Sequence, residues 1–141
     1  MRRIVTGLAL GAACVLTGTQ LPHVAAQFGP APNVIHSISL ASDGPVHAGE
    51  AVEFAAVISR TEICAATVNR FIWNVDTGEL AFSQQVAGNA LGIVDHGALT
   101  FSVHLPASIP SGRYRFESFV YNECSGRSFV AKSPVVFFSV E

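Results

Sequence analysis

Apolar and polar residues alternate one by one along most of this chain, and turn-forming residues interrupt the alternation repeatedly. The clearest example is residues 99–105, where leucine, phenylalanine and valine occupy every second position and threonine, serine and histidine lie between them. A period of two places one apolar row on one face of a β-strand. The folded part of the chain shows no 3.6-residue helical period. The pattern therefore predicts an all-β domain.

The alternation predicts seven strands separated by turns rich in glycine, proline, asparagine and aspartate. The strands are expected at residues 34–41, 51–60, 67–75, 80–86, 99–105, 113–121 and 127–140. In the turn Asp76–Glu79, Gly78 is free to adopt the positive φ of a hairpin. Pro134 is expected at an edge or a bulge, because proline donates no hydrogen bond to a sheet. About seven strands at this spacing, without helical crossovers, are typical of an antiparallel β-sandwich.

The first 26 residues have the parts of a secretory signal peptide. Two arginines precede an apolar run over residues 4–16, which is shorter than the roughly 20 residues of a membrane-spanning helix. Residues 24–26, Val-Ala-Ala, form an acceptable cleavage site. We therefore predict cleavage after Ala26 and a secreted or periplasmic protein. An uncleaved membrane anchor and a lipoprotein cut before Cys14 are the alternatives.

The mature chain is expected to consist of a flexible arm and one folded domain. Residues 27–33 contain two prolines and a glycine and are predicted to be the arm, so the domain covers residues 34–141. Only 13% of the residues are charged and half are apolar, which excludes a disordered chain. The formal net charge of −2 offers no basic surface for nucleic acid. No second segment is long enough to cross a membrane after the signal is removed.

Removal of the signal leaves two cysteines, Cys64 and Cys124. An even number of cysteines in an exported chain predicts a disulfide, because the compartments outside the cytoplasm are oxidising. The pairing also removes both thiols as metal ligands or as a nucleophile.

No recognisable catalytic or metal-binding set is present in the sequence. Asp95 and His96 are the adjacent acid–histidine pair, but neighbours on a strand point to opposite faces and cannot act together there. The histidines lack the spacing of paired metal ligands, although His47, Glu50 and Glu53 could hold a cation weakly. We therefore expect no enzyme activity, no cofactor and no metal.

The chain resembles the immunoglobulin-like and fibronectin type III-like β-sandwich domains of bacterial exported proteins. Trp73 lies mid-strand, where such domains place a core tryptophan, and Gly112-Arg113-Tyr114 after a proline-rich corner resembles a tyrosine corner. The resemblance implies that Trp73 and Tyr114 are buried and that strands 67–75 and 113–121 are neighbours. Cys124 lies ten residues after Tyr114, outside the usual position, so the disulfide is expected to join two loops.

One face of these two neighbouring strands is predicted to be an exposed binding surface. If Trp73 and Tyr114 face the core, alternation turns five other side chains outward: Arg70, Ile72, Arg115, Phe119 and Tyr121. Aromatic residues and arginine are enriched at binding hot spots, and exposed apolar patches mark interaction sites. We therefore predict a non-catalytic module that binds a protein. The alternatives are a carbohydrate-binding module and an assembly subunit that inserts the arm 27–33 into a neighbour.

Overall fold

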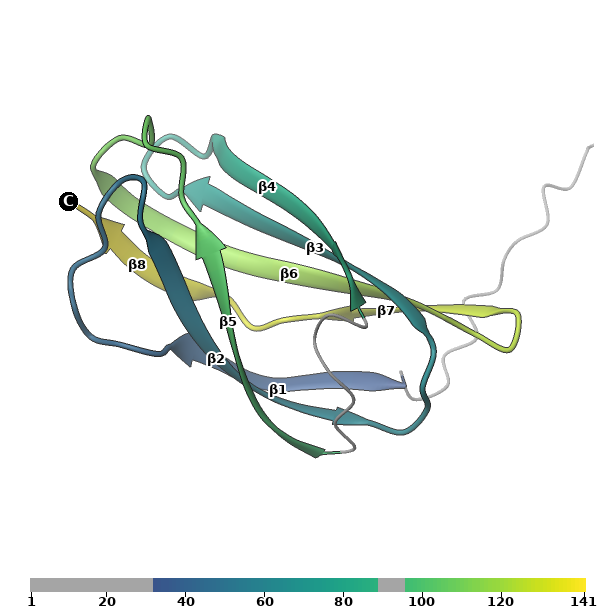
Figure 1. The fold of residues 1–141 in the computed structure, drawn as a ribbon. Coiled ribbons are helices and arrows are strands. Elements are labelled where there is room, and N and C mark those ends of the chain that lie inside the picture. Colours follow the sequence, from purple (N-terminus) through teal and green to yellow (C-terminus); the bar gives the residue numbers. More distant parts are fainter. Residues whose placement is uncertain (1–31, 89–95) are drawn as a thin grey trace, which may run out of the picture.

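The computed structural model describes residues 32–88 and 96–141, which form eight β-strands (Figure 1). The strands are β1 (Asn33–Leu40), β2 (Ala51–Arg60), β3 (Ala65–Asn74), β4 (Leu80–Ala87), β5 (His96–His104), β6 (Gly112–Cys124), β7 (Arg127–Lys132) and β8 (Val136–Val140). The predicted signal peptide and most of the predicted arm lie outside the described residues. Within them, no helix has the length and apolar character needed to span a membrane.

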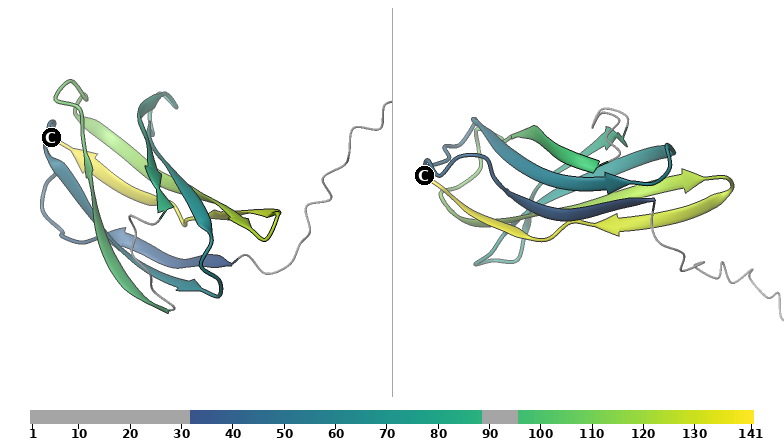
Figure 2. Two further views of the ribbon diagram at one scale, coloured as in Figure 1. Left: turned by 45° about the vertical axis from the view of Figure 1, so that its right-hand side comes forward. Right: turned by 90° about the horizontal axis from the view of Figure 1, so that it is seen from below.

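The strands form two antiparallel sheets packed face to face (Figure 2). One sheet has the order β1-β2-β5. The other has the order β4-β3-β6, and both β7 and β8 pair with β6 at its far edge. This arrangement confirms the predicted all-β fold, an immunoglobulin-like β-sandwich, and it makes β3 and β6 neighbours.

Proline divides the last predicted strand into two. Pro134 lies between β7 and β8, so the stretch predicted as a single strand pairs with β6 in two parts. Ser133 bridges the break: its backbone N–H donates to the Ser118 carbonyl at 2.9 Å, and its Oγ accepts from the Ser118 N–H at 2.8 Å. The start of the domain also differs from the prediction, because Asn33 is the first residue of β1 and is buried rather than part of the arm.

Aromatic stacking between the two sheets forms the centre of the core. Phe54 of β2 is fully buried and stacks on Phe116 of β6, with ring centroids 4.3 Å apart. Phe101 of β5 lies against both rings, at 5.4 Å from Phe54 and 5.9 Å from Phe116. The inward positions of β6 are its even-numbered residues, as the sequence predicts. The same phase buries Tyr114, whose hydroxyl is bonded across the corner before β6, so the predicted tyrosine corner is confirmed.

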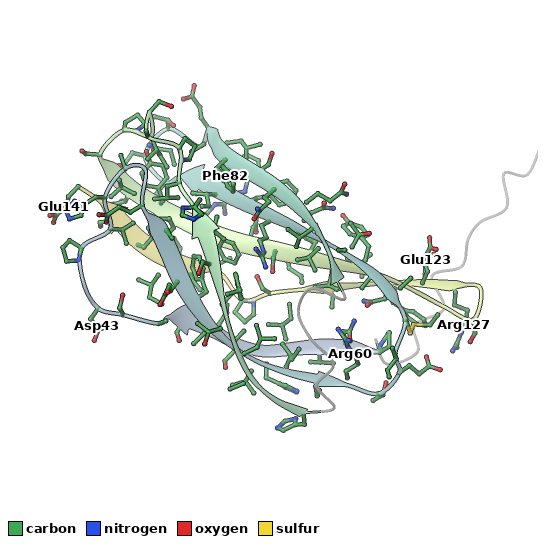
Figure 3. The ribbon with its side chains drawn as sticks, in the orientation of Figure 1. Asp43, Arg60, Phe82, Glu123, Arg127 and Glu141 are labelled. Carbon is green, nitrogen blue, oxygen red and sulfur yellow. A yellow bond between two sulfur atoms is a disulfide. The ribbon has the colours of Figure 1, made fainter. Side chains whose placement is uncertain are left out.

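The Cys64–Cys124 disulfide is present, with the two Cα atoms 5.1 Å apart. Ala65 pairs with Glu123, so the cysteines are the next residues along two adjacent strands of one sheet. Cys124 is the last residue of β6 and is buried, so the bridge joins a strand end to the residue preceding β3 rather than two loops. Figure 3 shows the sulfur atoms near Glu123 and Arg127, and Cys124 pairs with Arg127 beside the turn of the β6–β7 hairpin.

The predicted hairpin turn between β3 and β4 is also confirmed. Gly78 has a φ of 74°, which glycine adopts without steric cost. The side-chain oxygen of Asn74 accepts hydrogen bonds at 2.9 Å from the backbone N–H groups of Asp76 and Thr77. The turn is therefore fixed by a local side chain, as asparagine often does.

Candidate functional site

The outer face of the five-stranded sheet carries most of the exposed aromatic side chains of the described chain. In an antiparallel pair, directly opposite residues point to the same side of the sheet. The register pairs Trp73 with Arg115 and Asn69 with Phe119, so the odd-numbered residues of β3 and β6 point outward together. We call this surface the aromatic face, and its residues are Phe71, Trp73, Arg115, Glu117, Phe119, Tyr121, Val130, Lys132 and Phe137.

Contacts between rings and cations hold the middle of the aromatic face together. Phe71 lies 6.3 Å from Trp73 and 6.0 Å from Phe119, measured between ring centroids. The Arg115 guanidinium carbon lies 5.7 Å from the Trp73 centroid, and the Lys132 ammonium lies 5.4 Å from the Phe119 centroid. These separations are within the range of cation–π attraction. The two cations therefore cover the two ends of a continuous row of three rings.

The carboxylate of Glu117 is buried on the aromatic face. Glu117 lies opposite Phe71 in the β3–β6 register, yet its side chain is only about one-tenth exposed. Its Oε2 atom lies 3.3 Å from Nζ of Lys132, which is itself half-exposed. Lys132 thus neutralises the carboxylate and stacks on Phe119 at the same time. The centre of the face is consequently apolar and has no unpaired negative charge.

Three large apolar side chains on this face remain exposed to solvent. Tyr121 is 45% exposed, its direct partner Val130 is 55% exposed, and Phe137 opposite Arg115 is 65% exposed. Single exposed apolar residues are common on soluble proteins, but here the Tyr121–Val130 pair and Phe137 lie at opposite ends of the row of rings, and an apolar surface of this extent marks an interaction surface. All eight described strands belong to the two sheets, so no described strand lies over this face (Figure 1).

The structure separates the five residues predicted to form the binding surface. Arg115, Phe119 and Tyr121 lie on the aromatic face, but Arg70 and Ile72 point into the sandwich, and their predicted exposure is wrong. Ile72 is fully buried against the core because it pairs with Phe116, an inward residue of β6.

The phase of β3 is therefore one residue out from the prediction. The predicted core tryptophan, Trp73, lies half-buried on the outer face, while the even-numbered residues of β3 face inward. Both alternating rows of this strand contain apolar residues, so the pattern alone does not decide the phase, and the charge of Arg70 favoured the wrong choice. Sequence reasoning also missed Phe71, Val130 and Phe137; their only sequence signal is that they occupy the outward phase of strands next to β6.

Arg70 lies in the inner layer, where its guanidinium contacts an aromatic ring and a side-chain amide. Its guanidinium carbon is 4.3 Å from the centroid of Phe101, and its Nη1 donates to the Gln84 side-chain oxygen at 3.3 Å. Only 6% of the residue is exposed, and this burial lowers the pKa of the guanidinium because removal from water penalises the charged form. Arg70 thus uses its planar group as an aromatic stacking partner within the core.

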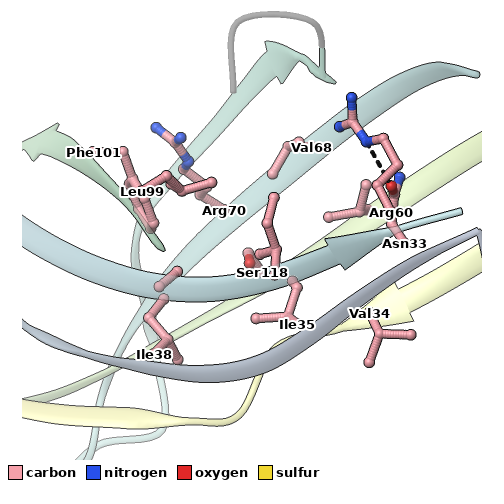
Figure 4. A pocket seen from close by; sticks show the side chains of 13 residues that line it. Asn33, Val34, Ile35, Ile38, Arg60, Val68, Arg70, Leu99, Phe101 and Ser118 are labelled. Carbon is pink, nitrogen blue, oxygen red and sulfur yellow. Dashed lines mark hydrogen bonds between the residues drawn. The ribbon is translucent and has the colours of Figure 1, made fainter. Parts of the chain in front are cut away.

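A small cavity lies between the sheets beside Arg70 (Figure 4). Its walls are mainly apolar and include Ile35, Ile58, Val68, Leu99 and Val120. At its polar end, Arg60 donates from Nε to the side-chain oxygen of Asn33 at 2.8 Å, and Asn33 donates in turn to Asn122. The centre of a water molecule can occupy about 40 Å³ of the cavity. That space holds a few waters and is too small for an organic ligand.

The acid, histidine and cysteine side chains give no set of three free metal ligands in the described chain. The one trio whose ligand atoms approach within 4.8 Å consists of Glu62, Cys64 and Cys124. Its two sulfur atoms are bonded to each other, so neither is a thiolate. The weak cation cluster considered at His47, Glu50 and Glu53 is not assembled.

No protein-family model matches this sequence, and no curated protein sequence matches it. Among solved structures, the chain is similar to the C-terminal domain of Wzt, with a TM-score of 0.55 and 11% identity over 78% of this chain and 74% of that one. Part of the alkylpurine DNA glycosylase AlkC of Pseudomonas fluorescens is also similar, with a TM-score of 0.48 and 15% identity over 80% of this chain and 31% of the glycosylase. At these identities the likeness concerns the β-sandwich fold alone.

Proposed function

We propose that this protein is a non-catalytic binding module that recognises a protein partner through the aromatic face. The observation that carries the proposal is the grouping of exposed Tyr121, Val130 and Phe137 around a packed row of rings. Protein interfaces combine a hydrophobic centre with aromatic and arginine anchors, and this face supplies both. The signal-peptide features of residues 1–26 support action outside the cytoplasm, in the periplasm or after secretion.

The geometry of the rings favours a protein over a carbohydrate. A sugar stacks on an exposed flat ring, but Phe71 is tilted by 36° to Trp73 and by 69° to Phe119, so the row presents no common plane. The indole N–H of Trp73 is covered and is not available to a sugar hydroxyl. A protein surface with protruding side chains can fill such an uneven face, and its acidic groups can reach Arg115 and Lys132.

Site-specific photo-crosslinking in the native host tests the proposal. A photoreactive phenylalanine analogue at Phe137 should give a discrete cross-linked protein that is lost when Tyr121→Ser is added, and a probe at Tyr121 should lose its product when Phe137→Ser is added. The matched control position is Ile63, which is 72% exposed but lies in the β2–β3 loop. Equal cross-linking from Ile63, or capture unaffected by both serine variants, would contradict a site on this face. Glycan-array binding lost in the same variants would replace the protein partner by a carbohydrate.

A further inference from the structure

Two histidines from strands that are not neighbours meet on the outer face of the three-stranded sheet. His36 belongs to β1 and His96 is the first residue of β5, with β2 between them. Their ring centroids are 5.8 Å apart, and the ring planes are inclined by 57°. Both residues are exposed. They are 60 positions apart in the chain, so the sequence carries no ligand spacing that would reveal the pair.

The backbone of β1 brings His36 toward its partner. The β1–β2 register shifts between Ile35 and Ser37, so His36 is the extra residue of a β-bulge. Bulges re-aim a side chain, and they are frequent beside functional sites. Ser59 of β2 pairs with His96 and lies beneath the two rings. Its small side chain leaves space for both imidazoles above a strand that separates their backbones by about 10 Å, two inter-strand spacings.

A hydrogen bond fixes the His36 ring. Its Nε2 atom lies 2.7 Å from the Ser59 hydroxyl oxygen. When Nε2 carries the proton and donates to this oxygen, the lone pair on Nδ1 is left for another partner. Histidines that ligate metals show this arrangement almost always, since the second ring nitrogen is held by a hydrogen-bonding neighbour.

The ring separation fits one shared metal ion. A metal–nitrogen bond is about 2.0–2.1 Å, and a ring nitrogen lies roughly 1.1 Å from its ring centroid, so two rings on one ion at the tetrahedral angle have centroids about 5.2 Å apart. The separation grows to about 6.4 Å as the two bonds become collinear. The observed 5.8 Å lies between these limits. The His36 ring is held by Ser59, so the remaining adjustment falls to the exposed side chain of His96.

We propose that His36 and His96 form a surface site for a divalent transition-metal ion, with Ser59 as the residue that positions His36. Imidazole nitrogen suits Cu²⁺, Ni²⁺ and Zn²⁺, and Cu²⁺ binds most tightly at a given nitrogen site. Water completes the coordination of an ion held by two side chains. The site lies on the opposite outer face of the sandwich from the aromatic face, so it is independent of the proposed protein binding.

Metal titration of the purified protein, prepared without a polyhistidine tag and stripped by a chelator, tests the site. We expect calorimetry to detect Cu²⁺ binding that weakens about tenfold or more in His36→Gln and in His96→Gln. His104→Gln is the matched control, because His104 is an exposed histidine on the same strand, and it should bind as the wild type does. Ser59→Ala should weaken binding and Ser59→Thr should restore it, because threonine keeps the hydroxyl.

Spectroscopy on the wild-type protein gives a second, variant-independent test. The electron paramagnetic resonance spectrum of bound Cu²⁺ should show coupling to two imidazole nitrogens, and Ni²⁺ should broaden the ring resonances of His36 and His96 before those of His104. Affinity unchanged in both glutamine variants, coupling to one nitrogen, or equal broadening at His104 would each overturn the site. Such a result would leave the role of the aromatic face untouched.

Discussion

The hydroxyl of Tyr114 donates a 2.7 Å hydrogen bond to the carbonyl oxygen of Pro110, four residues earlier in the chain. The Tyr114 ring is fully buried and stacks on Phe138 of β8, with centroids 5.9 Å apart. The hydrogen bond and the ring contact together tie the corner before β6 to β8 of the same sheet. Tyr114 faces the core, so the alternate residues Arg115, Phe119 and Tyr121 of β6 point to the aromatic face.

Replacing Tyr114 by phenylalanine removes this bond and keeps the ring. We expect the free energy of unfolding to fall by about 1 kcal/mol, since the Pro110 carbonyl loses its partner while packing is preserved. Urea denaturation followed by circular dichroism measures the change. Tyr121→Phe is the matched control, because it removes an exposed hydroxyl, and it should change stability by less than about 0.5 kcal/mol. Equal losses in the two variants would show that the corner bond contributes nothing.

Ser133 offers a second test of a single hydrogen bond. Its Oγ accepts from the buried backbone N–H of Ser118 where Pro134 interrupts the sheet, so Ser133→Ala leaves that N–H without a partner. An unsatisfied buried donor costs about 1–3 kcal/mol. Ser139→Ala on the exposed side of β8 is the control and should be close to neutral. A neutral Ser133→Ala variant would mean that water replaces the hydroxyl in the break.

The sequence predicted one of the two central strands correctly and the other out of phase, for a physical reason. In β6, Tyr114, Phe116 and Val120 share a row whose alternate positions hold Arg113, Arg115 and Glu117, so one phase is clearly more apolar. In β3, the inward row contains Arg70 and the outward row contains Phe71 and Trp73. Sorting the two rows by hydrophobicity therefore turns the wrong face of β3 toward the core. The sorting fails because a guanidinium can be buried when it stacks on a ring, as Arg70 does on Phe101.

The sequence predicted the set of residues on the aromatic face even less well. Phe137 and Val130 join it only because β7 and β8 both pair with β6, and the break at Pro134 that allows this was predicted merely as an edge or a bulge. The pairing of Cys64 with Cys124 needed no geometry, since the two cysteines that remain after the predicted signal peptide have one possible pairing. The meeting of His36 with His96 depends on a bulge, which alternation does not predict.

Arg70 tests how a buried cation affects stability. Arg70→Met removes a stacked, desolvated charge and fills the space with an apolar chain, so we expect the free energy of unfolding to change by less than about 1 kcal/mol. Arg70→Ala leaves a cavity, so its free energy of unfolding should be about 2–5 kcal/mol lower than that of Arg70→Met. Thermal and urea denaturation of the two variants provide the comparison. A large loss in Arg70→Met would show that stacking on Phe101 outweighs the desolvation cost.

The pH dependence of this effect has a definite sign. A folded-state pKa lowered below that of the unfolded chain means that the unfolded state holds the proton more tightly. The contribution of Arg70 to stability would therefore rise with pH only as the pH approaches the lowered pKa. Arginine stays protonated in the neutral range, so the difference between wild type and Arg70→Met should be constant from about pH 6 to pH 8.

Reduction of the disulfide should lower the melting temperature without abolishing the fold. The bridge joins residues separated by 60 positions, and the chain-entropy model assigns about 4 kcal/mol to a loop of that length. Differential scanning calorimetry with and without reductant measures the change, and the Cys64→Ser/Cys124→Ser protein should show the reduced value in both buffers. An unchanged melting temperature would mean that β3 and β6 are held together by their ladder alone.

Trp73 is the single tryptophan of the chain, so its fluorescence reports directly on the aromatic face. Because the ring is half-buried beside the Arg115 guanidinium, we expect iodide to quench it more strongly than caesium does, since the cation attracts the anionic quencher. Arg115→Gln should reduce iodide quenching and leave quenching by neutral acrylamide unchanged, whereas Arg113→Gln, a change at an exposed arginine paired with Asp76, should alter neither. Added salt should weaken the iodide preference by screening. Emission insensitive to all three quenchers would place Trp73 inside the sandwich, and the aromatic face would then lose its central ring.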